Sequence, residues 1–208
     1  MRRLAILGAG GHGQVVAETA ISLGWEELYF FDDAHPVAGC YGSTKGTVSD
    51  YLRQVDLCDG ALVAIGNIEI RERIQKHLVV AGANLVSLVS QFANVSPTVK
   101  IGAGCLVLPS AILASGVTLG DGVIINHGAV VDHDCTVGDF THICPRVAIG
   151  GDSTIESRCW VGIGSTVING ITIGTGAYLG AGAVLVRDLE PETVAYGVPA
   201  KVKSPQSA

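Results

Sequence analysis

From Ile101 onward, every sixth residue is aliphatic for fifteen consecutive positions, without an insertion or a deletion. These positions are Ile101, Val107, Leu113, Leu119, Ile125, Val131, Val137, Ile143, Ile149, Ile155, Val161, Val167, Ile173, Leu179 and Leu185. A six-residue period is typical of a parallel β-helix, in which each hexad supplies one short strand and one corner. Since three hexads complete a triangular coil, the period predicts a prism filled by these side chains, with residues 18 apart stacked on successive coils.

Small residues complete the repeat. A small or β-branched residue follows each aliphatic by four positions, and glycine often follows it directly. The chain has 28 glycines in 208 residues, about twice the average usage, and glycine supplies the positive φ that tight corners need. The six cysteines include no C-x-x-C pair, and Cys105, Cys135 and Cys159 occupy the small inward position. We therefore interpret the thiols as packing residues rather than metal ligands or disulfide partners.

Residues 1–88 lack this period and alternate between apolar strands and amphipathic helices. The predicted elements are strands at 4–7, 28–31, 61–65 and 85–89, with helices at about 14–23 and about 68–81. The pairs Glu69/Arg73 and Glu72/Lys76 indicate a solvated face on the second helix. The sequence thus predicts two domains: a small Rossmann-like α/β domain with a parallel sheet at 1–88, and a parallel β-helix with a short tail at 89–208.

The first strand runs into a glycine loop, Gly8-Ala9-Gly10-Gly11-His12-Gly13, and the second ends at Asp32-Asp33. A G-x-G-x-x-G loop between a strand and a helix, with an acid about 20 residues on, is typical of dinucleotide binding. A full dinucleotide fold needs two βαβαβ halves, whereas only about four strands fit here. We therefore favour one nucleotide, with its phosphates at the helix N-terminus, over an NAD oxidoreductase. A tight turn without a ligand stays open.

Charge and hydropathy exclude several classes of partner. The net charge is −6 and no basic stripe is present, which argues against nucleic acid. The apolar runs are too short to span a bilayer, and the apolar stretch after Arg2-Arg3 is too short for a signal peptide. We expect a cytoplasmic protein that binds no membrane.

Five segments together resemble a known family: the glycine loop, the acidic pair, Ala64-Ile65-Gly66-Asn67 with Glu69-Ile70-Arg71, Val131-Asp132-His133-Asp134-Cys135, and Gly197-Val198-Pro199-Ala200-Lys201. They are similar to the hexapeptide-repeat acetyltransferases of nucleotide sugars and sialic acid. The branch most alike N-acetylates UDP- or GDP-linked amino sugars, including the UDP-4-amino sugars of bacillosamine synthesis. The resemblance implies a left-handed β-helix, a homotrimer, and acetyl-CoA in a groove between neighbouring prisms.

The resemblance also implies roles for particular residues. His133 matches the general base, and Asp134 takes the place of a glutamate that raises its basicity, with a side chain one methylene shorter. His142 matches a position that binds acetyl-CoA, and Asn126 a polar position near the chemistry. The nucleotide sugar is expected at Gly10, Gly11, His12, Asp32, Asp33, Gly66 and Asn126. Acetyl-CoA is expected at His142, Gly151, Ile163 and Ala181.

Spacing supports His133 independently, since Ser115 and Gly151 stack below and above it and both are small. We expect an open slot for substrate beside the imidazole. A three-histidine metal site, as in γ-class carbonic anhydrases, is disfavoured because His127, His133 and His142 do not align on one face, so no metal is expected. The predicted activity is acetyl transfer from acetyl-CoA to an amine of a nucleotide-linked sugar. Sugar O-acetylation, and a trimer that binds nucleotide sugars without catalysis, remain alternatives.

Overall fold

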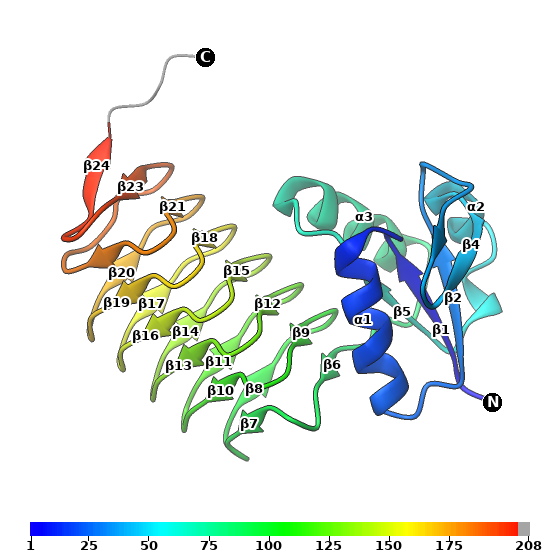
Figure 1. The fold of residues 1–208 in the computed structure, drawn as a ribbon, viewed down its shortest axis with the longest axis horizontal. Helices are drawn as coiled ribbons and strands as arrows, with labels where there is room; N and C mark the ends of the chain where they lie inside the picture. Colours follow the sequence, from blue (N-terminus) through cyan, green and yellow to red (C-terminus); the bar gives the residue numbers. More distant parts are fainter. Residues whose placement is uncertain (204–208) are drawn as a thin grey trace. The chain divides into compact units, whose positions relative to one another are not determined.

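The computed structural model describes residues 1–203, which form two compact units (Figure 1). The first unit holds Met1–Gln91 and Ala103–Cys105, and the second holds Phe92–Gly102 and the described residues from Leu106 onward. The domain division expected between residues 88 and 89 stays a prediction.

The first unit is a five-stranded sheet with helices, in the strand order β3-β4-β2-β1-β5. Its elements in chain order are β1 (Arg3–Leu7), α1 (Gly11–Ser22), β2 (Glu27–Phe31), β3 (Ala38–Gly39), β4 (Gly42–Gly46), α2 (Val48–Leu52), a 3-10 turn (Val55–Leu57), β5 (Gly60–Val63), α3 (Ile68–Val80) and β6 (Leu88–Val89). The strands β4, β2, β1 and β5 pair in parallel, and β3 pairs with β4 antiparallel. The chain therefore steps from β1 outward to β2 and β4, and then returns to the other side of β1 with β5.

The central strand β1 explains this unit's core. It pairs with β2 on one side and with β5 on the other, and Leu4–Leu7 are completely buried. A parallel strand covered on both faces requires such a continuous apolar run. The helix α3 begins where Asn67 accepts a hydrogen bond from the Ile70 N–H through Oδ1 at 2.9 Å, which satisfies one free donor of the first turn.

The structure departs from the sequence expectations in three places. Helix α1 begins at Gly11 rather than Gln14, so its first turn includes the end of the glycine loop. The hairpin of β3 and β4, with the short helix α2 after it, was not predicted. The expected strand at 85–89 is reduced to an isolated bridge between Leu85 and Ala61 and the two-residue strand β6.

The second unit is a stack of two-residue strands (Figure 1). They are β7 (Asn94–Val95), β8 (Lys100–Ile101), β9 (Leu106–Val107), β10 (Ile112–Leu113), β11 (Thr118–Leu119), β12 (Ile124–Ile125), β13 (Val130–Val131), β14 (Thr136–Val137), β15 (His142–Ile143), β16 (Ala148–Ile149), β17 (Thr154–Ile155), β18 (Trp160–Val161), β19 (Thr166–Val167), β20 (Thr172–Ile173), β21 (Tyr178–Leu179) and β22 (Val184–Leu185), followed by the longer β23 (Val194–Tyr196) and β24 (Lys201–Lys203). The three sheets run β22-β19-β16-β13-β10-β7, β20-β17-β14-β11-β8 and β24-β23-β21-β18-β15-β12-β9.

The predicted β-helix register is confirmed. Each predicted aliphatic is the second residue of its strand, and all of them except the half-buried Ile101 are buried. Parallel neighbours are 18 residues apart, as in the pairs Val131↔Ile149 and Ile149↔Val167. The repeat also begins earlier than predicted, since Val95 ends β7 in the same register.

The regular coil ends near Leu185. The strand β23 pairs with β21 through Tyr178↔Val194, a separation of 16 rather than 18 residues, and Leu189 bridges to Ile173 with the same shortened spacing. The last strand, β24, then turns back antiparallel onto β23. This change of direction ends the stack of parallel strands.

All six cysteines are free thiols, and five of them are buried, as expected for packing residues. Cys40, at the tip of the β3–β4 hairpin, is exposed and does not fit that interpretation. Within residues 1–203, no helix combines the length and apolar character needed to cross a membrane.

Candidate active site

His133 and Asp134 form a hydrogen-bonded pair at the corner that follows β13. The backbone of Asp134 is in the left-handed region, with φ of 58°, a conformation that Asp tolerates better than most residues. Its Oδ2 lies 3.0 Å from His133 Nδ1, and the side chains are 59% and 68% exposed. The β-helix thus presents an accessible imidazole with an acid on one of its nitrogens.

The pKa of His133 is raised above its ordinary value, chiefly by the hydrogen bond to Asp134 and then by the charge of Asp132. In the neutral ring, Nδ1–H donates to the carboxylate, so the lone pair is on Nε2. The pair is therefore suited to accept a proton at Nε2 and to stabilise the cation that results.

Replacing Asp134 tests this assignment. We expect Asp134→Asn to lower the pKa of His133 because the variant loses both the negative charge and the acceptor of a charge-assisted hydrogen bond. Titration of the His133 ring protons by NMR measures the shift. Asp152→Asn is the matched control, since Asp152 contributes least among the groups that raise this pKa and its loss should lower it less. Equal shifts in the two variants would contradict the assignment.

The two small residues expected beside His133 are in place, but the open slot expected next to Gly151 is not. Ser115 and Gly151 do lie on the neighbouring coils, where Asp134 N–H donates to Ser115 O and Asp152 N–H donates to His133 O, both at 2.9 Å. A Cβ on Gly151, however, would lie 2.6 Å from His133 Nε2. The space that Gly151 leaves is therefore taken by the imidazole itself, and the expectation of free space there was wrong.

Asn126 and His142 also come together, on the outer face of β12 and β15. Asn126 Nδ2 lies 3.1 Å from Nε2 of His142, and Asn126 Oδ1 accepts from the backbone N–H of His127 at 2.8 Å and lies 2.9 Å from its Nδ1. The Asn126 amide thus joins two imidazoles. His142 is 5% exposed and packs edge-on against Trp160, with ring centroids 4.6 Å apart.

Ile163 and Ala181 lie in one column at a corner of the prism, where the Gly182 N–H donates to Ile163 O at 2.8 Å. Both side chains are exposed, and Ile163 is 56% exposed although it is apolar. An adjacent face carries a row of ring contacts made by His142, Trp160, Tyr178 and Tyr196, with successive centroids 4.6, 6.1 and 6.0 Å apart. The first contact is edge-on, the second is parallel and the third is tilted. This side of the β-helix thus exposes the large apolar side chains of Ile163, Tyr178 and Tyr196.

In the first unit, Gly10 is the N-cap of α1. No side chain caps the helix there, and its first turn contains no acidic residue. The glycines of the loop have two different roles. Gly8 has a φ of 115°, and a Cβ on Gly13 would collide with the Gly8 carbonyl oxygen, so these two are required by the fold. Gly10 and Gly11 have nothing within 4 Å of the place of a Cβ, so they leave space above the helix N-terminus.

A pocket of about 230 Å³ lies at the carboxyl ends of β1, β2 and β5. Its lining residues are Gly8, Asp32, Asp33, Val48, Ile65, Ile70, Arg73 and Ile74. Because the strand order reverses between β1 and β5, this is the switch point at which open parallel sheets bind ligands. The sequence analysis did not predict Arg73 as a site residue, because it paired Arg73 with Glu69 on the solvated face of the helix. Among residues 1–203, Glu69 and Arg73 form no ion pair, whereas Glu72 and Lys76 do.

The predicted acidic pair is already engaged by the protein's own backbone. Asp32 accepts the Ala9 N–H at 2.8 Å through Oδ2 and the Ala34 N–H through Oδ1, so it fixes the glycine loop. Asp33 accepts the Val48 N–H at 3.1 Å through Oδ1. Both carboxylates still line the pocket.

Gly66 lies beside this pocket, directly after the lining residue Ile65. Arg71, only 1% exposed, donates from one nitrogen to the carbonyl oxygens of Ile65 and Gly66 at 3.0 and 2.9 Å. Burial lowers the pKa of Arg71 to about 10. The buried arginine therefore fixes the turn between β5 and α3.

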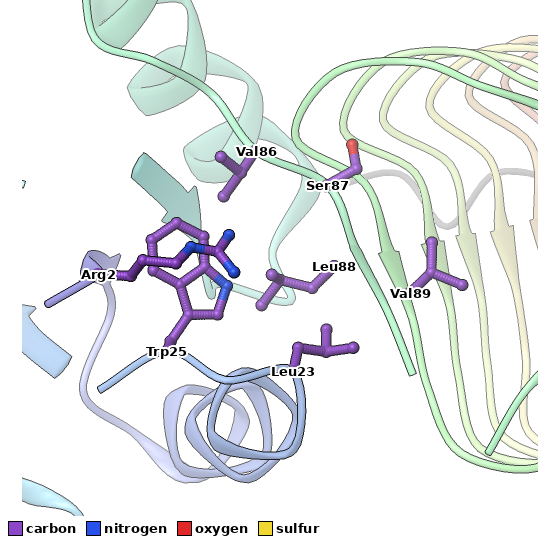
Figure 2. Close-up of a pocket in the computed structure, with 7 residues that line it drawn as sticks. All are labelled: Arg2, Leu23, Trp25, Val86, Ser87, Leu88 and Val89. Carbon is purple, nitrogen blue, oxygen red and sulfur yellow. The ribbon is translucent and has the colours of Figure 1, made fainter. Parts of the chain in front are cut away.

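A second pocket, of about 490 Å³, lies within the first unit near the amino ends of β1 and β2 (Figure 2). Figure 2 shows the Arg2 side chain lying across Trp25, with the guanidinium carbon 4.1 Å from the ring centroid. No residue predicted for the site lines this pocket. Within residues 1–203, no cluster of three or more His, Cys, Asp or Glu side chains could hold a metal ion.

Two family models match the chain. The PglD N-terminal domain matches residues 3–78, and the bacterial transferase hexapeptide repeat matches residues 98–133 and 152–187. Together with the switch-point pocket and the exposed histidine on a β-helix, these matches define a hexapeptide-repeat acyltransferase with an α/β domain.

Similar proteins narrow the class. The acetyltransferase domain of PglB from Neisseria gonorrhoeae FA1090, also solved in complex with acetyl coenzyme A, is 38% identical and superposes with a TM-score of 0.93 over 98% of this chain and 100% of that one. PerB from Caulobacter crescentus, solved with CoA and GDP-perosamine, is 35% identical with the same TM-score over 98% of both chains. A GDP-perosamine N-acetyltransferase of Escherichia coli O157:H7 is 26% identical over 82% of this chain and 80% of its own. The chain belongs to this family of PglB- and PerB-like acetyltransferases.

Proposed function

We propose that this protein transfers the acetyl group of acetyl-CoA to an amino group of a sugar linked to a nucleoside diphosphate. The observation that carries the proposal is the accessible His133, whose Nδ1 is hydrogen-bonded to Asp134 and whose Nε2 is left to accept a proton. An accessible imidazole held at one nitrogen by a carboxylate is suited to act as a general base. Whole-length similarity to acetyltransferases solved with acetyl-CoA and with GDP-perosamine supports the choice of donor and acceptor.

The buried thiols favour direct transfer over an acyl-enzyme. Cys135 follows the His133–Asp134 pair, but it is buried inside the prism, and burial raises its pKa. Burial also raises the pKa of Cys144, the other thiol near this site, to about 12. A neutral, enclosed thiol is a poor nucleophile. The sugar amine is therefore the attacking group.

In the proposed reaction, the neutral amine attacks the thioester carbonyl while His133 Nε2 accepts its proton. The new C–N bond forms, the C–S bond breaks, and the thiolate of CoA leaves and regains a proton from the imidazolium or from solvent. Asp134 stabilises the imidazolium at Nδ1. We assign the Gly151 N–H as a donor to the oxyanion, since it is on the coil next to the base. His142, Ile163 and Ala181 would contact the pantetheine arm of acetyl-CoA.

The nucleotide would occupy the switch-point pocket. Its phosphates fit the N-terminus of α1 at Gly10, Gly11 and His12, where no side chain caps the helix and the helix dipole favours an anion. The cationic Arg73 lines the same pocket and supplies the positive charge that Asp32 and Asp33 lack. The acids suit hydroxyl or base N–H donors, and Gly66 lies beside them.

Gly10→Val tests the nucleotide site. Because Gly10 has φ of −69° and open space at its Cβ, valine should fit the fold but occupy the phosphate site. We expect UDP, GDP or dTDP binding, whichever the native protein has, to weaken at least tenfold, about 1.4 kcal/mol, while acetyl-CoA binding is kept. Calorimetric titration with each ligand measures this.

Gly13→Ala is the matched control, because a Cβ there would collide with the Gly8 carbonyl. It should lower the melting temperature, which Gly10→Val should not. If Gly10→Val abolished the binding of both ligands and also lowered the melting temperature, the variant would act on folding. The support for a nucleotide site at Gly10 would then be removed.

Release of free thiol from acetyl-CoA, measured against a panel of UDP-, GDP- and dTDP-amino sugars, tests the activity directly. Hydroxyl analogues of the active sugar and free sialic acid form a second arm. Turnover only with amines supports N-acetylation, whereas turnover with hydroxyl acceptors would favour the O-acetyltransferase alternative. Binding without thiol release would favour a binding protein instead.

We also propose that the protein acts as a homotrimer. The row of aromatic rings of Trp160, Tyr178 and Tyr196 and the exposed Ile163 give the β-helix an apolar surface that supports contact with a second copy. Light scattering across a dilution series, with activity measured on the same samples, tests the assembly.

A further inference from the structure

The catalytic pair proposed above packs against glycines of both neighbouring coils. A Cβ on Gly151 would lie 2.6, 2.7 and 2.9 Å from Nε2, Cε1 and Cδ2 of His133. On the other side, a Cβ on Gly116 would collide with Oδ1 of Asp134. No real Cβ approaches ring atoms so closely, so the imidazole and the carboxylate lie where they do because both neighbours lack a side chain.

The backbone alone does not explain why position 151 is glycine. Gly116 has a φ of 78°, which favours glycine whatever its surroundings, but the φ of Gly151 is outside the left-handed region. Alanine could therefore adopt the Gly151 backbone without strain. The three atoms nearest to a Cβ at this position all belong to the His133 ring.

We propose that Gly151 is a positioning residue for the reaction: its missing side chain lets the His133 ring lie against the next coil, which places Nε2 beside Gly151 and keeps Nδ1 on Asp134. The proposal rests on His133 being the base. Because the His133 side chain is 59% exposed, a Cβ at residue 151 would displace the ring rather than the prism.

The expected effect of Gly151→Ala is thus on rate and not on stability. We expect kcat to fall about 10²-fold, the loss that a displacement of about 1 Å can cause, with KM for the sugar nucleotide and the melting temperature nearly unchanged. The pKa of His133 should fall toward its ordinary value, because the displaced ring loses part of the hydrogen bond that raises it. The variant retains the backbone N–H at residue 151, so loss of an oxyanion donor would not explain the result.

Gly138→Ala is the matched control. It is also a β-helix glycine outside the left-handed region, but its Cβ would lie 2.6 Å from the backbone N of Ser157, which cannot move aside as a side chain can. We expect the opposite pattern: a lower melting temperature with normal kcat per folded molecule. A kcat loss in Gly138→Ala as large as in Gly151→Ala would overturn the proposal.

A double-mutant cycle completes the experiment. With His133→Ala, the Cβ at residue 151 meets no ring, so Gly151→Ala should cause no further loss of kcat or stability. If Gly151→Ala alone fails to fold, recovery of folding in the double variant still supports the contact. An unchanged His133 pKa and unchanged kcat in Gly151→Ala would overturn it. A shifted pKa with normal kcat would instead keep the contact and overturn His133 as the base.

Discussion

His133→Ala is expected to lower kcat by about 10²–10⁴-fold, the usual contribution of a positioned general base. Acetyl-CoA and the sugar nucleotide should still bind, because the removed ring is 59% exposed and supports no core packing. Steady-state kinetics with titrations of each substrate separates the two effects. The pH profile of the native kcat/KM should rise through the raised pKa of His133, and in Asp134→Asn this limb should move to lower pH because the pKa falls.

His127→Ala is the control for the histidine prediction. Asn126 Oδ1 lies 2.9 Å from His127 Nδ1, and this ring is exposed, so His127 is a second accessible imidazole on the β-helix. The group beside its Nδ1 is an amide oxygen, however, whereas His133 has the carboxylate of Asp134, which makes the stronger, charge-assisted hydrogen bond. Normal kcat in His133→Ala with a large loss in His127→Ala would transfer the role of base to His127.

The sequence predicts the β-helix well because every hexad has the same pattern, with an aliphatic residue that points inward from one short strand. The position that Ile149 occupies points inward, as do the positions of Val131 and Val167 on the neighbouring coils. Aliphatic residues therefore recur there at a fixed interval. The α/β unit repeats nothing, and its less regular parts were missed. The segment of β3 and β4 is short, mostly exposed and rich in glycine, so no hydrophobic alternation marks it as a hairpin.

The candidate site shows the same division. The sequence indicates His133, Asp134 and the glycine loop because each belongs to a recognisable motif, the first two in Val131-Asp132-His133-Asp134-Cys135 and the loop directly after the first strand. Arg73 is not, since an arginine four residues after Glu69 has the pattern of an ordinary solvated helix face. Arg73 lies at the pocket because α3 follows the carboxyl end of β5. The strand β5 pairs with β1, which ends at the glycine loop, so the start of α3 and the loop line the same pocket.

Gly151 marks a further limit of sequence reasoning. Stacking at 18-residue intervals identifies it as the neighbour of His133, but it does not say whether the space belongs to a substrate or to the ring. Only the position of the His133 ring decides this: the ring lies where a Cβ of residue 151 would be, and its Nδ1 is hydrogen-bonded to Asp134. The roles of His133, Asp134 and Gly151 therefore follow from their side-chain contacts, which the 18-residue spacing alone does not give.

Ile149→Asp is expected to prevent folding of the β-helix. Ile149 is 2% exposed in β16, between Val131 and Val167 of the neighbouring coils. The variant loses an aliphatic contact worth about 2–5 kcal/mol and buries a carboxylate with no cationic partner, which costs several kcal/mol more. Together these losses approach the entire stability of a typical domain, about 5–15 kcal/mol. Circular dichroism and thermal melting measure the outcome.

Ala148→Asp is the control that makes this experiment decisive. Ala148 is the other residue of β16, exposed on the outer face, so an aspartate there stays in water and the melting temperature should change little. Because side chains alternate between the two faces of a strand, a charge at residue 149 should prevent folding, whereas a charge at the neighbouring residue 148 should leave the stability nearly unchanged. If Ile149→Asp folds normally, or if Ala148→Asp destabilises the protein equally, the inward register of the hexads is wrong. The stacking of Gly151 on His133 would then lose its basis as well, because both depend on the same 18-residue coil.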